Sequence, residues 1–219
     1  MGWVTSRVPR RPTEPPDTTG TPVLVVLGGV PGAGKSTVLR AVERLRPDAE
    51  VLDPEQRQRR LAPHLQGVPY RVWRPLVHVL HHLDVLRSLL AGPSDGRPRL
   101  VHDTATRAWG RALASRLATA GGRRPVLVLL DVTEDSAVAG QVLRGRMVRR
   151  PAFERHWRRW TVLRSRLTWD RPSGGDREGW SRVVLVSRDE VLEEVLSLLD
   201  GRAGGQAARI GVRAAGPGC

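Results

Sequence analysis

One stretch of the sequence has the residue types and spacing of a phosphate-binding loop. The stretch GVPGAGKS, from Gly29 to Ser36, matches the pattern G-x-x-x-x-G-K-[ST] and lies between an apolar run and an amphipathic segment. Its glycines permit unusual backbone torsions, so that N–H groups converge on phosphate oxygens at the positive end of a helix. In this pattern the lysine reaches the β- and γ-phosphates, and the serine hydroxyl binds Mg²⁺. The predicted nucleotide-binding residues are Gly29, Val30, Pro31, Gly32, Ala33, Gly34, Lys35, Ser36 and Thr37.

Lys35 is the only lysine in the chain. Lysine and arginine together number 36, so the other 35 cations are arginine. Arginine is planar and forked, whereas lysine is a compact charge on a flexible stem, which suits a ring of backbone amides. We therefore predict that Lys35 is catalytic and contacts the transferred phosphate.

Three carboxylates, Asp53, Asp103 and Asp131, each end an apolar run. In open parallel sheets, ligands bind at the carboxyl ends of the strands, so these acids belong to the edge where chemistry is expected.

Short apolar runs alternate with helical patterns along the chain. The expected strands are 22–28, 49–53, 98–103, 125–131 and 181–187. The expected helices are about 35–46, 70–91, 107–120, 134–145, 152–167 and 189–199. This alternation predicts an α/β fold: a P-loop NTPase three-layer sandwich with a doubly wound, five-stranded parallel sheet.

Two nucleotide-binding classes fit poorly. GTPases read guanine with N-K-x-D, but the chain has no Asn and no second Lys. AAA-type machines carry an acidic D-E pair after the third strand, whereas here LVHDTATR has one carboxylate followed by Thr. We therefore expect ATP, although a phosphate loop alone specifies binding and not the reaction.

Four stretches together resemble the small P-loop kinases, nearest to the polynucleotide-kinase-like branch with its zeta-toxin-like and gluconate-kinase-like enzymes. They are GGVPGAGKST, VLDPEQR, VHDTATR and LRGRMVRR, and the resemblance extends over about residues 22–200. It implies a phosphotransferase that moves the γ-phosphate of ATP·Mg²⁺ to a hydroxyl-bearing substrate, which the sequence does not identify.

The resemblance also implies roles for individual residues. Asp53 matches the base that accepts the proton of the attacking hydroxyl, and Asp103 matches the acid that binds Mg²⁺ together with Ser36. The arginine-rich segment looks like a helical LID at about 144–152 that closes over ATP. Of its arginines, Arg146 and Arg149 are our candidates for contacting the transferred phosphoryl group.

Other interpretations of these residues are open. Asp53 and Asp103 could each cap a helix, Asp131 is expected to do so, and the LID arginines could form a solvated face. Arg57 follows Asp53 by four residues, whereas polynucleotide kinases have an arginine after three, which argues against a nucleic-acid substrate.

The segment 70–90 combines an apolar stripe with histidines. His78 and His82 are four residues apart, but no third metal ligand accompanies them. His102, beside Asp103, is expected to be structural. The stripe consists of Val72, Leu76, Val79, Leu80, Leu83 and Leu86.

A net charge of +14 and a pI near 11.6 leave nucleic acid open as a partner. The scarcity of Lys, Asn and Ile looks like coding bias in a GC-rich genome, so nucleic acid is not favoured. A 5′-hydroxyl kinase of nucleic acid and an ATP-driven switch without a small acceptor are the alternative functions.

The ends of the chain, 1–21 and 201–219, are rich in Pro, Gly and charge and are expected to be disordered tails around a domain at 22–200. A single cysteine, Cys219, and the lack of an apolar run long enough to cross a membrane predict a cytoplasmic protein. The oligomeric state is not specified by the sequence.

Overall fold

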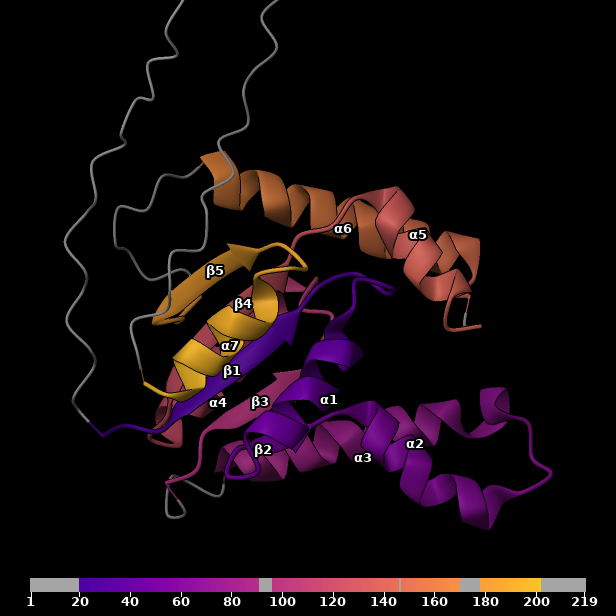
Figure 1. The fold of residues 1–219 in the computed structure, drawn as a ribbon, viewed down its shortest axis with the longest axis horizontal. Coiled ribbons are helices and arrows are strands. Elements are labelled where there is room, and N and C mark those ends of the chain that lie inside the picture. The colour runs from indigo at the N-terminus through magenta and orange to yellow at the C-terminus, as the bar shows by residue number, and fades with distance from the viewer. Residues whose placement is uncertain (1–19, 91–95, 146, 170–177, 202–219) are drawn as a thin grey trace, which may run out of the picture.

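The computed structural model describes residues 20–90, 96–145, 147–169 and 178–201, which form a parallel sheet with helices on both faces (Figure 1). The strand order is β2-β3-β1-β4-β5, and every neighbouring pair is parallel. The strands are β1 (Val23–Gly28), β2 (Glu50–Leu52), β3 (Arg99–His102), β4 (Arg124–Leu130) and β5 (Arg182–Val186). The predicted fold class is confirmed.

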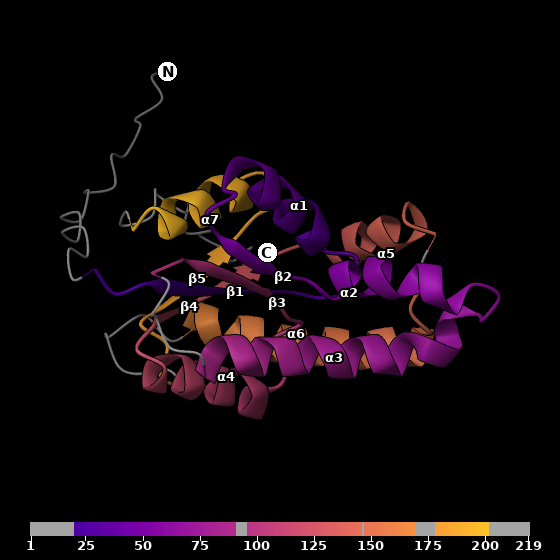
Figure 2. The same cartoon turned by 90° about the horizontal axis from the view of Figure 1, so that it is seen from below.

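Helices cover both faces of this sheet and its carboxyl edge (Figure 2). One face carries α1 (Lys35–Leu45) and α7 (Val191–Leu199), and the other carries α3 (Tyr70–Leu90), α4 (Ala108–Ala120) and α6 (Arg150–Trp169). Beyond the carboxyl ends of the strands lie α2 (Pro54–Leu61), the 3₁₀ helix η1 (Ala62–Leu65) and α5 (Glu134–Val142).

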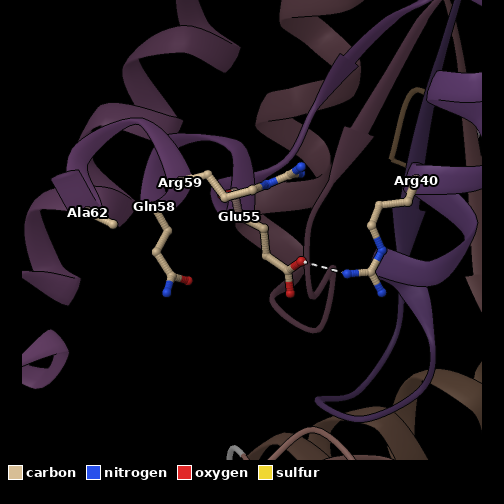
Figure 3. Close-up of a pocket in the computed structure, with 5 residues that line it drawn as sticks. All are labelled: Arg40, Glu55, Gln58, Arg59 and Ala62. Atoms are coloured by element: carbon tan, nitrogen blue, oxygen red, sulfur yellow. Dashed lines mark hydrogen bonds and ion pairs between the residues drawn. The ribbon is translucent and has the colours of Figure 1, made fainter.

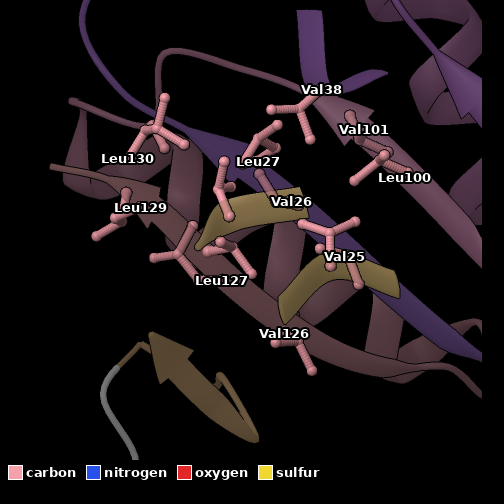
Figure 4. Close-up of a cluster of buried hydrophobic side chains, with 14 of the residues drawn as sticks. Val25, Val26, Leu27, Val38, Leu100, Val101, Val126, Leu127, Leu129 and Leu130 are labelled. Carbon is pink, nitrogen blue, oxygen red and sulfur yellow. The ribbon is translucent and has the colours of Figure 1, made fainter. Parts of the chain in front are cut away.

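The core lies on and around the three central strands (Figure 4). All six residues of β1 are buried, as are the last six of β4, because both faces of these strands are covered by helices. Val38 and Leu39 of α1 pack onto the same cluster. This rigid centre holds the loops that follow β1, β3 and β4 at one edge.

The strands and most helices agree with the predicted bounds to within a few residues. Helix α2 was not predicted, because PEQRQRRL buries none of its residues and lacks an apolar period. Helix α5 ends at Val142, three residues before the predicted end. The predicted tails lie outside the described residues except at their inner ends, and Cys219 lies outside them altogether. In the described part of the chain, no helix is long and apolar enough to cross a bilayer.

Candidate active site

The phosphate-binding loop connects β1 to α1, and its glycines adopt the torsions that the motif requires. Gly29, Gly32 and Gly34 have φ of 146°, 87° and 112°, in the region that other residues avoid. Gly32 also lies against α5, where an added Cβ would be 1.9 Å from the carbonyl oxygen of Ala137. The loop is therefore shaped both by its own torsions and by contact with α5.

Gly32→Ala is expected to disrupt nucleotide binding and to destabilise the fold by about 2 kcal/mol or more, because the loop and α5 must separate. Gly67→Ala is the matched control. Gly67 has a similar φ of 84°, but nothing lies within 4 Å of an added Cβ. Denaturant unfolding and ATP titration compare the two variants; equal losses of stability would show that the contact with α5 contributes nothing.

The Lys35 side chain is folded back over this loop. Its Nζ donates to the carbonyl oxygens of Gly29 at 2.6 Å and Val30 at 3.0 Å, and the residue is 5% exposed. Burial lowers the pKa of Lys35 to about 8. The charge of Asp103 acts to raise this pKa, the charge of Arg144 lowers it further, and the charge of Asp53 acts to raise it. Both predicted acids therefore act electrostatically on the loop lysine.

Asp53 is buried at the end of β2 and is held through one oxygen. Its Oδ1 accepts from the N–H of Glu55 at 3.0 Å, as the N-cap of α2, and from Nδ1 of His102 at 2.9 Å. None of the described residues donates to Oδ2. Burial acts to raise the pKa of Asp53. The hydrogen bond and charge of His102, together with the hydrogen bond from the Glu55 N–H, outweigh burial, so the pKa of Asp53 is lowered. The cap predicted as an alternative to catalysis is present, and it leaves one carboxylate oxygen available.

His102 is the partner of Asp53 that sequence reasoning assigned to structure alone. A carboxylate only accepts, so Nδ1 of His102 carries the proton in this bond. The carbonyl oxygen of His102 accepts from Nε2 of the buried His81 on α3 at 3.1 Å. Burial lowers the pKa of His81 to about 4. A neutral His81 thus connects α3 to the strand that orients Asp53. The sequence feature that could have indicated this role is the adjacent pair His102 and Asp103 at the end of β3.

The donors offered to a metal fit Mg²⁺ bound together with a nucleotide. Ser36 is buried at the start of α1, and Asp103 follows β3, where its Oδ1 accepts from the N–H of Thr104 at 2.6 Å. In the described residues, no three His, Cys, Asp or Glu side chains gather as a metal site. Mg²⁺ commonly uses one or two protein ligands, with phosphates and water completing its shell. A hydroxyl and one carboxylate suit that chemistry.

Two side chains that the sequence analysis missed support the phosphate-binding loop from outside. Arg188, after β5, donates to the carbonyl oxygens of Ala33 at 2.9 Å and Gly32 at 3.0 Å. Gln141 of α5 donates to the carbonyl oxygen of Pro31 at 3.4 Å and accepts from the N–H of Val148 at 2.8 Å. Neither could be found from spacing, because each contacts the loop from more than 100 residues away in sequence.

The segment predicted as a LID connects α5 to α6 beside the phosphate-binding loop. Arg144 donates to the Thr37 hydroxyl at 3.3 Å and is the arginine placed at the loop. Arg146 lies outside the described residues. Arg149 is exposed and, within the described part of the chain, its side chain has no hydrogen-bond or ion-pair partner. The roles given to Arg146 and Arg149 therefore stay predictions.

Asp131 does not cap a helix, contrary to expectation. The cap of α5 is Thr133, whose hydroxyl accepts from the N–H of Ser136. Asp131 instead accepts from Arg164 of α6 at 3.0 Å. The prediction failed because the partner comes from a helix 33 residues away.

Arg57, four residues after Asp53, forms an ion pair with Asp84 of α3. This pair ties α2 to α3 and engages the arginine that would otherwise be a candidate for binding nucleic acid. A hollow of about 290 Å³ lies near the same helix (Figure 3). Its lining contains none of the predicted site residues, so we do not place the nucleotide in it. It is lined by Arg40, Glu55, Gln58, Arg59 and Ala62.

A family model described as an AAA domain matches residues 24–167, which is more than half of the chain and includes the phosphate-binding loop, Asp53 and Asp103. The chain belongs to this AAA-domain family, although LVHDTATR lacks the acidic pair expected of AAA-type machines after the third strand. The match supports nucleotide binding by this P-loop domain. None of the curated proteins searched matches the sequence.

Two solved structures share the P-loop fold with this AAA-domain protein. One is from the PezAT toxin–antitoxin system of Streptococcus pneumoniae, with 18% identity and a TM-score of 0.52 over 77% of this chain and 68% of the other. The second is named as a predicted kinase from Chloroflexus aurantiacus, with 18% identity and a TM-score of 0.53 over 82% and 97% of the two chains. At this identity the likeness establishes the fold alone.

Proposed function

We propose that the protein is an ATP-dependent phosphotransferase that moves the γ-phosphate of ATP·Mg²⁺ to a hydroxyl group of a second substrate. The observation that carries the proposal is the buried Asp53 carboxylate, fixed through Oδ1 and with no described donor at Oδ2. This carboxylate lies within electrostatic reach of the phosphate lysine, and its Oδ2 is available to accept the proton of an attacking hydroxyl.

Each step is assigned to residues of this chain. The loop amides and Lys35 bind the phosphates, and Ser36 and Asp103 would hold Mg²⁺, which neutralises charge on the phosphate oxygens. Oδ2 of Asp53 accepts the proton of the attacking hydroxyl and aligns its oxygen with the γ-phosphate. Arginines of the segment 144–152 stabilise the charge that spreads over the transferred group. The kinase-named structural neighbour supports this class of reaction.

The proposal is tested by screening hydroxyl-bearing acceptors with γ-labelled ATP, including nucleosides, sugars and a nucleic-acid 5′-hydroxyl. We expect label to move to one acceptor class and ADP to form in step with it. ADP formation that no acceptor accelerates would instead favour the nucleotide-driven switch.

His102 is expected to act on the reaction through Asp53. His102→Leu removes one of two donors to Oδ1, so kcat should fall by about 10- to 100-fold while the KM for ATP stays within about twofold. His102→Asn should recover most of the rate, because its amide nitrogen lies close to the position of Nδ1. Steady-state kinetics of both variants check this; equal losses in the two would assign His102 to packing alone.

A further inference from the structure

Helix α3 has two apolar faces, and only one of them packs against the rest of the protein. Its inner face buries Trp73, Val77, His81, Ser88 and Leu89. On the opposite face, six valines and leucines are between 40% and 63% exposed. Figure 2 shows α3 below the sheet, with α6 behind it and α4 at its left end, and no described element is drawn over its near side. The exposed residues are Val72, Leu76, Val79, Leu83, Leu86 and Leu90, here called the outer stripe.

The outer stripe has the spacing of a coiled-coil seam. Successive members are separated by four, three, four, three and four residues, which is the heptad pattern with a period of 3.5. Scattered exposed apolar side chains are ordinary, but a continuous row of six along one helix marks an interaction surface. The periodicity favours a helix as the partner, because knobs-into-holes packing requires the same repeat on both sides.

We propose that the outer stripe binds the outer stripe of a second copy of this chain, as an antiparallel helix pair around a two-fold axis. In the register centred between Val79 and Leu83, Val79 lies opposite the partner's Leu83. The same register pairs Leu76 with the partner's Leu86 and Val72 with the partner's Leu90. Every member is matched, as a self-complementary two-fold interface requires.

Charge favours a second copy over a different helix. By heptad position the stripe is flanked by Trp73, Leu80 and Arg87 on one side and by Pro75, His82 and Leu89 on the other, and of these Trp73 and Leu89 are buried in the inner face. In the antiparallel register Arg87 comes opposite the partner's Trp73, so no two arginines face each other. A foreign helix with acidic flanks would find a single arginine to pair with. A foreign helix with basic flanks would gain little, because the nearest acid to the stripe, Asp84, is already paired with Arg57.

The area is sufficient for a specific contact. Six side chains from each copy, each about half exposed, amount to on the order of 1,000 Å² of apolar surface, the range in which stable interfaces begin.

Sedimentation of the full chain tests the proposal. Wild type should have twice the 24.2 kDa mass of one chain at micromolar concentration. Val79→Lys and Leu83→Glu should each reduce the mass to that of a monomer, because each places two unpaired charges in the seam. Val79 and Leu83 are 56% and 41% exposed, so both variants should keep the wild-type circular dichroism.

Mixing the two variants tests the register. In the antiparallel pair, the ammonium introduced at position 79 of one chain meets the carboxylate introduced at position 83 of the other. The two remaining central positions keep their native residues, so Leu83 of the first chain still packs against Val79 of the second. The mixture should therefore recover the dimer mass. A parallel pair would oppose position 79 to position 79 and gain nothing from mixing.

Val162→Lys on α6 and Leu45→Glu on α1 are matched controls, since these residues are 52% and 57% exposed outside α3, and both should stay dimeric. A monomeric wild type, or dimers unaffected by Val79→Lys and Leu83→Glu, would overturn the proposal. A mixture that stays monomeric would overturn the antiparallel register.

Discussion

Asp53→Asn is expected to lose acceptor phosphorylation by about two to four orders of magnitude in kcat, while its affinity for ATP changes by less than about threefold. Asparagine has the shape of aspartate, and its Oδ1 can still accept from the Glu55 N–H and from His102. The helix cap is therefore kept, and the proton acceptor at Oδ2 is lost. Transfer of label from γ-labelled ATP measures the rate, and calorimetric titration measures ATP binding.

The same substitution at the end of another strand is the control. Asp131 is 7% exposed and pairs with Arg164, so Asp131→Asn should lower the melting temperature by breaking a partly buried ion pair. Its kcat should stay within about twofold of wild type, because this carboxylate is engaged with α6. Full transfer activity in Asp53→Asn would falsify the assignment of the base and leave Asp53 as a helix cap.

The fold was largely predictable because the central strands are buried on both faces. Continuous apolar runs such as 22–28 and 125–131 carry that signal without any knowledge of contacts. The strand order was not readable, since every β-α unit obeys the same pattern. Helix α2 was missed because it buries nothing, and its one sequence signal was Asp53 followed by Pro54 at the first helical position.

The outer face of α3 shows a second limit, because the sequence reveals an apolar stripe but not whether that stripe is buried. The spacing of Val72, Leu76 and Val79 indicates an apolar stripe, but a pattern does not say which of two apolar faces meets the sheet. The structure buries the face with Trp73 and Val77 and exposes the stripe.

Site residues were predictable where one motif contains them and unpredictable where distant segments meet. The phosphate-binding loop is local, so its glycines and Lys35 followed from eight consecutive residues. The bond between His102 and Asp53 joins residues 49 positions apart, and Arg188 contacts the loop from 155 positions away. Spacing carries no information about such contacts, because they depend on which strands become neighbours.

Lys35→Arg is expected to abolish phosphoryl transfer and to weaken ATP binding by about 100-fold or more, although it preserves the charge. Lys35 is 5% exposed, and its ammonium donates to two loop carbonyl oxygens. A guanidinium is wider, planar and longer by one atom, so it would have to displace the loop or point away from it.

Lys35→Met separates size from charge, because methionine is also a slender, unbranched chain but has no ammonium. If the loop selects lysine for its shape and charge together, both variants lose ATP binding, and Lys35→Arg lowers the melting temperature more than Lys35→Met does. Arg40→Lys, on the exposed side of the same helix, should change none of these quantities, since the Arg40 side chain is 47% exposed. Transfer at the wild-type rate by Lys35→Arg would mean that the single lysine of this arginine-rich chain is there by chance, and that charge alone serves the phosphates.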